Sequence, residues 1–100
     1  MNPPEFTEVD PRTLYLPPSL FSGADPFKLH RQIAAHGTST DGMPPLIVYR
    51  GTDGGLVIAD GVTRATRVAR LLPGNLVTVE VIGAWRAAVG KYPTIGDRVP

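Results

Sequence analysis

The pattern of apolar and polar residues along this chain of 100 residues predicts short strands alternating with helices. Runs rich in β-branched and aromatic residues at 6–9, 46–50 and 56–59 are typical of strands, and so is the alternating segment LVTVEVI at 76–82. The runs at 46–50 and 56–59 flank the turn GTDGG and predict a hairpin. Because both runs are apolar without alternation, we expect this part of the sheet to be covered on both faces.

The first helix is bounded by clear start and stop signals. Asp25 is a good N-cap, Pro26 suits the first helical position, and Gly37 supplies the stop. The intervening sequence PFKLHRQIAAH places Leu29 and Ile33 on one face, with Phe27 beside them. We therefore expect an amphipathic helix with a broad apolar side.

The second helix is expected to begin at Asp60 or Gly61 and to end at Pro73-Gly74. Its buried stripe has the spacing i, i+3, i+4, i+7 and comprises Ala65, Val68, Ala69 and Leu72. Arg67 falls away from this stripe and is expected on the outer side of the helix.

The segment FTEVDPRTLYLPP at 6–18, a short strand followed by an extended stretch, forms an N-terminal arm. The order of arm, helix, hairpin, helix and strand predicts one small domain of the α+β or α/β class. We take residues 1–100 as this domain, with a core at about 6–83 and a C-terminal tail at 84–100. A short helix over Trp85–Val89 is one interpretation of the tail, and the last ten residues are expected to be loosely held. Trp85 and Tyr92 either close the core or stack on a base, with the core favoured.

Composition limits the classes of function. The net charge of +1 excludes the general basicity of a chain wrapped in nucleic acid, but not a local anion site. The absence of cysteine excludes disulfides, thiolate metal sites and cysteine nucleophiles. The N-terminal residues do not have the pattern of a secretory signal peptide, and no apolar run approaches about 20 residues. We therefore expect a cytoplasmic domain without a membrane partner.

The segment LVIADGVTRATRVARLLPG carries the best candidate site, because a predicted strand runs through a glycine into an arginine-bearing helix. The first amides of a helix lack acceptors, and the helix dipole makes that end electropositive. Gly61 would let a phosphate approach the backbone, and Val62 would offer a free amide. Thr63 would add a hydroxyl donor, and the planar guanidinium of Arg64 could bind two phosphate oxygens at once. Arg67, one turn further along the helix, would add to the positive electrostatic potential of the site.

An ordinary structural role is an equally good interpretation of the same residues. Gly61 would then be a turn glycine, Thr63 a first-turn cap, and the arginines a solvated face. Asp60 is expected to cap the helix, because its charge opposes a phosphate unless it faces away or shares a divalent cation. Glu8 and Asp10 are weaker candidates for handling a proton or a metal, and exposed solubilising charge is the favoured interpretation for both.

The chain resembles the ParB/sulfiredoxin-like domains in the order and spacing of several motifs. The corresponding segments are LHRQIAAHG (29–37), PPLIVYR (44–50), GTDGG (51–55), LVIADG (56–61), GVTRATRVARL (61–71) and VTVEVI (77–82). The resemblance covers about residues 6–83. It implies a mixed sheet with a central β-hairpin and two main helices.

The resemblance also implies that the junction of glycine and helix binds the phosphates of ATP or CTP, with Mg²⁺ as a further cofactor. Gly61 and Arg64 take the family's conserved Gly and Arg places. Sulfiredoxin has Gly-Cys-His-Arg where this chain has Gly61-Val62-Thr63-Arg64, so sulfinic-acid reduction is excluded. ParB-type domains have a metal-holding Glu at the place of Val62, which argues against metal-dependent CTP hydrolysis.

Three functions follow as hypotheses. The first is binding of a phosphate-bearing ligand, a nucleotide or a nucleic acid, at Gly61–Arg64, with enzymatic activity uncertain. The second is a non-catalytic interaction module, an accessory or toxin–antitoxin-type component with a protein partner or a homodimer. The third is a metal-dependent nuclease that uses Asp60.

Overall fold

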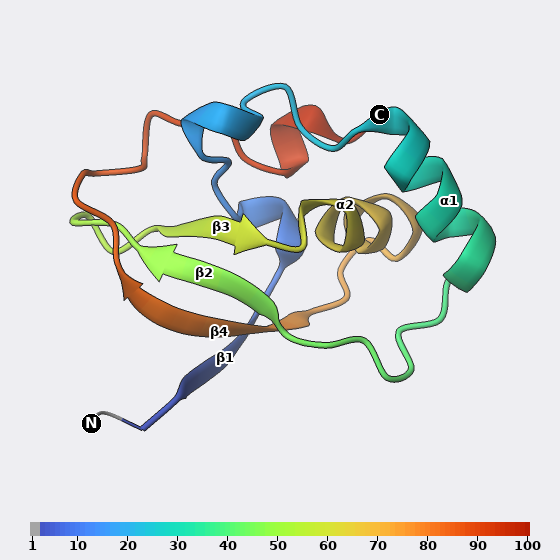
Figure 1. Ribbon diagram of the computed structural model, residues 1–100, viewed down its shortest axis with the longest axis horizontal. Helices are drawn as coiled ribbons and strands as arrows, with labels where there is room; N and C mark the ends of the chain where they lie inside the picture. The colour runs from blue at the N-terminus through green and yellow to red at the C-terminus, as the bar shows by residue number, and fades with distance from the viewer. Residues whose placement is uncertain (1–2) are drawn as a thin grey trace.

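In a computed structural model that describes residues 3–100, a mixed sheet of four strands is ordered β1-β4-β2-β3 (Figure 1). The strands are β1 (Glu5–Val9), β2 (Leu46–Arg50), β3 (Leu56–Asp60) and β4 (Val77–Ala84). β1 pairs antiparallel with β4, β4 parallel with β2, and β2 antiparallel with β3. This is the small α+β fold with a mixed sheet and a hairpin that the sequence predicts.

Burial alternates along the two inner strands. Leu46 and Val48 of β2 are fully buried, whereas Ile47 and Tyr49 between them are only partly buried. β4 begins with the same alternation. The expectation that the hairpin is covered on both faces holds in part, because the neighbouring residues Val57 and Ile58 of β3 point to opposite faces and are both fully buried. The outer face of β1 is not covered, since Phe6 is exposed.

The core lies between the inner face of the sheet and α2 (Val62–Leu71). Ala65, Val68 and Ala69 of α2 are buried as predicted, and the arm before α1 adds Leu14 and Leu16. Tyr15, between these leucines, extends the sheet by a parallel bridge to Val57 of β3. The arm thus covers the edge of the hairpin.

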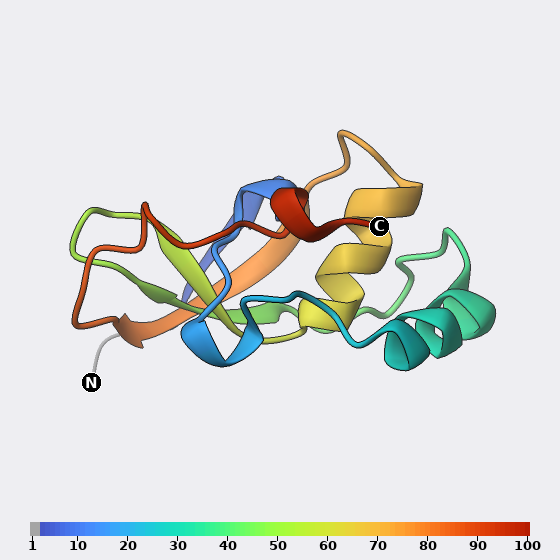
Figure 2. The same ribbon diagram turned by 90° about the horizontal axis from the view of Figure 1, so that it is seen from above.

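The helix α1 (Pro26–His36) has the predicted bounds, with Asp25 as N-cap and Gly37 as C-cap. It packs beside α2 at the edge of the molecule farthest from the β2–β3 turn (Figures 1 and 2). Leu29 is its buried residue, but Phe27 is 81% exposed. The apolar side of α1 is therefore narrower than expected. No helix within residues 3–100 is long and apolar enough to cross a bilayer.

The C-terminal tail is part of the packed structure. Val89 and Ile95 are fully buried, and the amide of Ile95 donates to the carbonyl oxygen of Leu14 at 2.8 Å. No helix forms over Trp85–Val89, and a short 3-10 helix at Gly96–Arg98 lies close to the one at Pro11–Thr13 (Figure 2). The expectation of a loosely held tail is wrong, because the tail returns to pair with the arm.

Candidate functional site

The junction between β3 and α2 places free backbone donors at the surface. The first hydrogen bond of α2 runs from the amide of Ala65 to the carbonyl oxygen of Gly61, at 2.9 Å. The amides of Val62, Thr63 and Arg64 precede it and have no acceptor within the helix. The positive end of the helix dipole adds to their attraction for an anion.

Gly61 makes this junction sterically feasible. Its φ of +105° is one that other residues adopt at a cost, and it is the N-cap of α2 without a side-chain hydrogen bond. A Cβ at this position would lie 2.5 Å from Leu46 Cδ2 and 2.9 Å from Arg64 Nη2. The sequence therefore needs glycine here both for the turn and for the close approach of two neighbours.

The predicted capping roles of Asp60 and Thr63 are not observed. α2 begins at Val62 with no side-chain cap. The carboxylate of Asp60 instead accepts a hydrogen bond from Arg64 Nη2 at 3.3 Å and is 75% exposed. Asp60 ends β3, one residue too early for its carboxylate to take the cap position held by Gly61.

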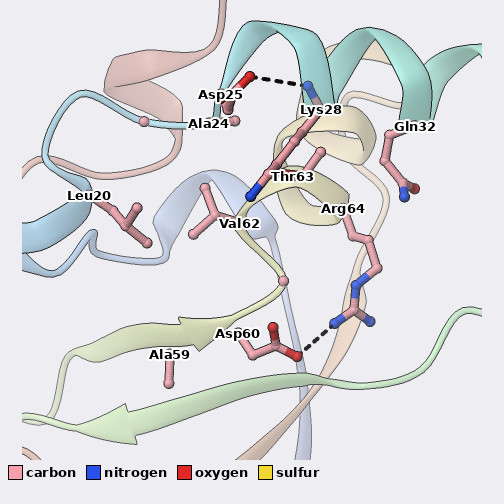
Figure 3. A pocket seen from close by; sticks show the side chains of 12 residues that line it. Leu20, Ala24, Asp25, Lys28, Gln32, Ala59, Asp60, Val62, Thr63 and Arg64 are labelled. Atoms are coloured by element: carbon pink, nitrogen blue, oxygen red, sulfur yellow. Dashed lines mark hydrogen bonds and ion pairs between the residues drawn. The ribbon is translucent and has the colours of Figure 1, made fainter.

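A cavity of about 340 Å³ opens at this end of α2 (Figure 3). Gly61, Val62, Thr63 and Arg64 form one side of it, so the structure brings together four of the five predicted ligand residues. The other side comes from α1 and the segment before it, which contribute Leu20, Gly23, Ala24, Asp25, Lys28 and Gln32.

Lys28 and Gln32 are site residues that the sequence interpretation missed. Figure 3 shows the Lys28 side chain reaching from α1 toward the first turn of α2, near Val62 and Thr63. The spacing of Lys28 and Gln32, i and i+4, marks a polar stripe on α1. That stripe was visible in the sequence, but nothing local indicated that it faces the start of α2.

The two acids that line the cavity each have partners of their own. Asp25 caps α1 by accepting from the amides of Phe27 at 2.8 Å and Lys28 at 3.2 Å. Asp60 is engaged with Arg64. The ammonium of Lys28 takes part in no ion pair among residues 3–100, so it and the amides of α2 are the donors that the cavity offers to an anion.

Arg67 lies elsewhere. Its side chain is only 2% exposed and does not line this cavity, so the expectation of an outward-facing Arg67 is wrong. Nη1 donates to the carbonyl oxygens of Gly37 and Ser39, both at 2.8 Å. The helical pattern predicted an outer position because it takes no account of the loop after α1, which folds over this side of α2.

The remaining candidates lie outside the cavity. Glu8 is on β1 opposite Thr78, and the carboxylate of Asp10 accepts from the amide of Arg12 at 2.9 Å. Residues 3–100 contain no group of three or more His, Asp or Glu side chains that could hold a metal ion. The geometry therefore brings neither acid to the site.

Trp85 and Tyr92 also lie outside the cavity, and they are not part of the main core cluster. Their rings pack edge to face with centroids 6.4 Å apart, and Trp85 Nε1 donates to the Tyr92 hydroxyl at 3.3 Å. The favoured core assignment is therefore wrong. The two rings form part of an aromatic cluster with Tyr49 and Phe21.

A larger groove, of about 650 Å³, lies at the other end of the sheet, between the start of β1 and the end of β4. Its arginine, Arg50, makes a two-point ion pair with Glu5, at 3.1 and 2.6 Å. This pair lowers the pKa of Glu5 and raises that of Arg50, chiefly through the hydrogen bonds between them. Because Glu5 neutralises Arg50, we expect this groove to attract an anion less strongly than the cavity at the start of α2, where Lys28 has no ion-pair partner in the described part of the chain.

No protein-family model matches this sequence, and no curated protein matches it.

Proposed function

We propose that the cavity at the start of α2 binds a phosphate-bearing ligand, a nucleotide or a nucleic acid. The observation that carries the proposal is the convergence of Lys28 on the free amides of Val62–Arg64 across a cavity of about 340 Å³. Amides at a helix start and a lysine ammonium are complementary to phosphate oxygens. The resemblance to ParB/sulfiredoxin-like domains supports the same location.

Each residue has a defined role in this proposal. Gly61 makes the turn that brings the amides of α2 to the cavity, and Thr63 adds its hydroxyl. Lys28 supplies a point charge from α1. Arg64 borders the site and reaches the ligand by exchanging its exposed contact with Asp60, which is long at 3.3 Å. ATP and CTP, with or without Mg²⁺, are the first ligands to try.

Amide NMR spectra recorded during titration with inorganic phosphate, ATP and CTP test the proposal. The amide resonances of residues 61–64 are expected to shift most. Lys28→Ala should weaken binding roughly 10- to 150-fold, because a hydrogen bond to a charged group contributes about 1.5–3 kcal/mol. Lys91→Ala, at an exposed lysine outside the cavity, is the matched control and should bind as the parent does. The proposal fails if millimolar ligand leaves the 61–64 amides unmoved.

A second candidate is an interaction module, and the outer face of the sheet favours it. Phe6 is 53% exposed and Ile82 is 48% exposed. Phe6 pairs with Glu80, two residues from Ile82, so the two apolar side chains are diagonal neighbours on one face. Two results together would favour this candidate. Analytical ultracentrifugation would show a homodimer that is lost in Phe6→Ser, and the amide resonances of residues 61–64 would not shift in the titration. No comparable observation favours a nuclease.

A further inference from the structure

Arg67 is a buried cation in the middle of α2. Nη1 is satisfied by the carbonyl oxygens of Gly37 and Ser39, and Nη2 lies 3.8 Å from Met43 Sδ. Nε is fully buried and has no hydrogen-bond partner among residues 3–100. The guanidinium thus holds the loop that follows α1, but part of its donor capacity is unused.

The charge of Arg67 lacks a counter-charge. No carboxylate within residues 3–100 lies within salt-bridge distance of its guanidinium. Burial lowers the pKa of Arg67, yet an arginine side chain remains protonated in proteins. The two carbonyl oxygens and the negative end of the α1 dipole offset part of the desolvation cost. A full positive charge buried this deeply is normally paired with a negative one.

A small cavity lies beside Arg67, underneath the loop at 37–44. Its volume is about 90 Å³, room for roughly three water molecules or one small inorganic anion. Side chains that can donate line it from α1, the loop and α2: Gln32, His36, Ser39, Arg64 and Arg67. Asp41, an exposed residue of the loop, also lines this cavity.

We propose that this cavity binds a small inorganic anion, of which chloride and phosphate are the common sources, with Arg67 as its counter-ion. The site is distinct from the cavity at the start of α2, although Arg64 and Gln32 line both. It is formed by a guanidinium that is 2% exposed rather than by the amides of a helix start. An anion there would stabilise the loop against α2, so its effect appears in the stability of the protein.

Thermal unfolding at constant ionic strength tests the proposal, with sodium chloride or sodium phosphate replacing sodium gluconate, whose anion is too large for the cavity. Chloride or phosphate should raise Tm in a saturable manner, and the salt that produces this rise identifies the anion that binds. Arg67→Met should abolish the response to both. Arg70→Met, on the same helix but exposed and outside this cavity, should retain it. No saturable response in the parent, or an equal one in Arg67→Met, would overturn the proposal.

Two measurements keep the test decisive if Arg67→Met does not fold. Crystals of the unaltered protein soaked in bromide should give an anomalous peak within hydrogen-bond reach of Arg67, and a peak only elsewhere on the surface would mean an adventitious ion only and reject the site. Asp41→Asn should retain or strengthen the anion response, since it removes a competing negative charge. If Asp41→Asn instead destabilises the protein and leaves it without a response, then Asp41 is the counter-ion and the proposal is wrong.

The proposed phosphate site and this anion site fail separately. Lys28→Ala should leave the chloride response of the protein unchanged, because Lys28 lines the cavity at the start of α2 and does not line the cavity beside Arg67. Arg67→Met should leave the shifts of the 61–64 amides with ATP in place, provided the variant folds.

Discussion

Arg64 and Pro44 are joined by a hydrogen bond of 2.8 Å from Nη1 of the guanidinium to the backbone carbonyl oxygen. Pro44 lies just before β2, whereas Arg64 is in the first turn of α2. One side chain therefore ties the entry of a central strand to the start of the helix that covers it. Arg64 has a structural task whether or not it also meets a ligand.

Arg64→Ala should destabilise the protein by about 1–3 kcal/mol, because it removes a charged donor and leaves the Pro44 carbonyl without that partner. Chemical denaturation measures the change. Arg70→Ala is the matched control, since Arg70 is exposed on the same helix and should change stability by less than about 0.5 kcal/mol. Equal losses in the two variants would show that the bond to Pro44 contributes nothing.

Gly61→Ala should cost more stability than the same change at another glycine with positive φ. Gly61 combines a φ of +105° with an approach of 2.5 Å between an added Cβ and Leu46 Cδ2, in the core. Gly54 has a φ of +86° and nothing within 4 Å of an added Cβ. Backbone strain alone costs about 1–3 kcal/mol, so Gly54→Ala should lose that much and Gly61→Ala more.

Urea unfolding of both alanine variants measures the difference between strain and overlap. If Gly61→Ala is no less stable than Gly54→Ala, Leu46 moves aside without cost, and the tight approach at the α2 junction is not a constraint on the site.

Ile95→Ala should destabilise the protein by about 2–5 kcal/mol, as expected for a large side chain removed from a packed core. Ile95 is 1% exposed and belongs to the same cluster as Leu14 and Leu16. Ile82→Ala makes the same substitution at a residue that is 48% exposed, and its loss should be much smaller. Similar midpoints for the two variants in thermal unfolding would mean that the tail does not pack on the core in solution.

These contrasts indicate which features are encoded locally. The bounds of α1 were predictable because Asp25, Pro26 and Gly37 act on their own neighbours in sequence. The strands followed from runs of apolar residues for the same reason. The junction at Gly61–Arg64 was found because a strand, a glycine and a helix start adjoin in the chain.

The remaining features depend on segments distant in sequence. Arg67 is buried by the loop that follows α1, and the guanidinium bonds carbonyl oxygens 28 and 30 residues away. Lys28 enters the cavity only because α1 lies beside α2. Ile95 is buried because the tail pairs with Leu14. A periodicity analysis weighs each helix face as though it were alone, so it has no means of assigning these three positions.

The stability of the protein should fall in acid partly because of Asp53, in the β2–β3 turn. Its carboxylate accepts from the amides of Val89 at 3.2 Å and Gly90 at 2.9 Å, which joins the turn to the tail. These hydrogen bonds, with that of Val89 the largest cause, lower the pKa of Asp53. A carboxyl group with a lowered pKa in the folded state binds its proton more readily when the protein is unfolded. Its contribution is therefore complete above the unfolded pKa of about 3.9 and is lost as the pH falls toward the folded value.

Thermal unfolding between about pH 6 and pH 2 isolates this contribution. Asp53→Asn should lower Tm near neutral pH and flatten the acid limb of the Tm profile, because the amide cannot titrate. The limb should not vanish, since hydrogen bonds from Thr94 also lower the pKa of Asp97. Glu8→Gln is the control, as the Glu8 carboxylate makes no hydrogen bond or ion pair within residues 3–100. An acid limb as steep in Asp53→Asn as in Glu8→Gln would mean that the contacts of Asp53 with Val89 and Gly90 do not persist in solution.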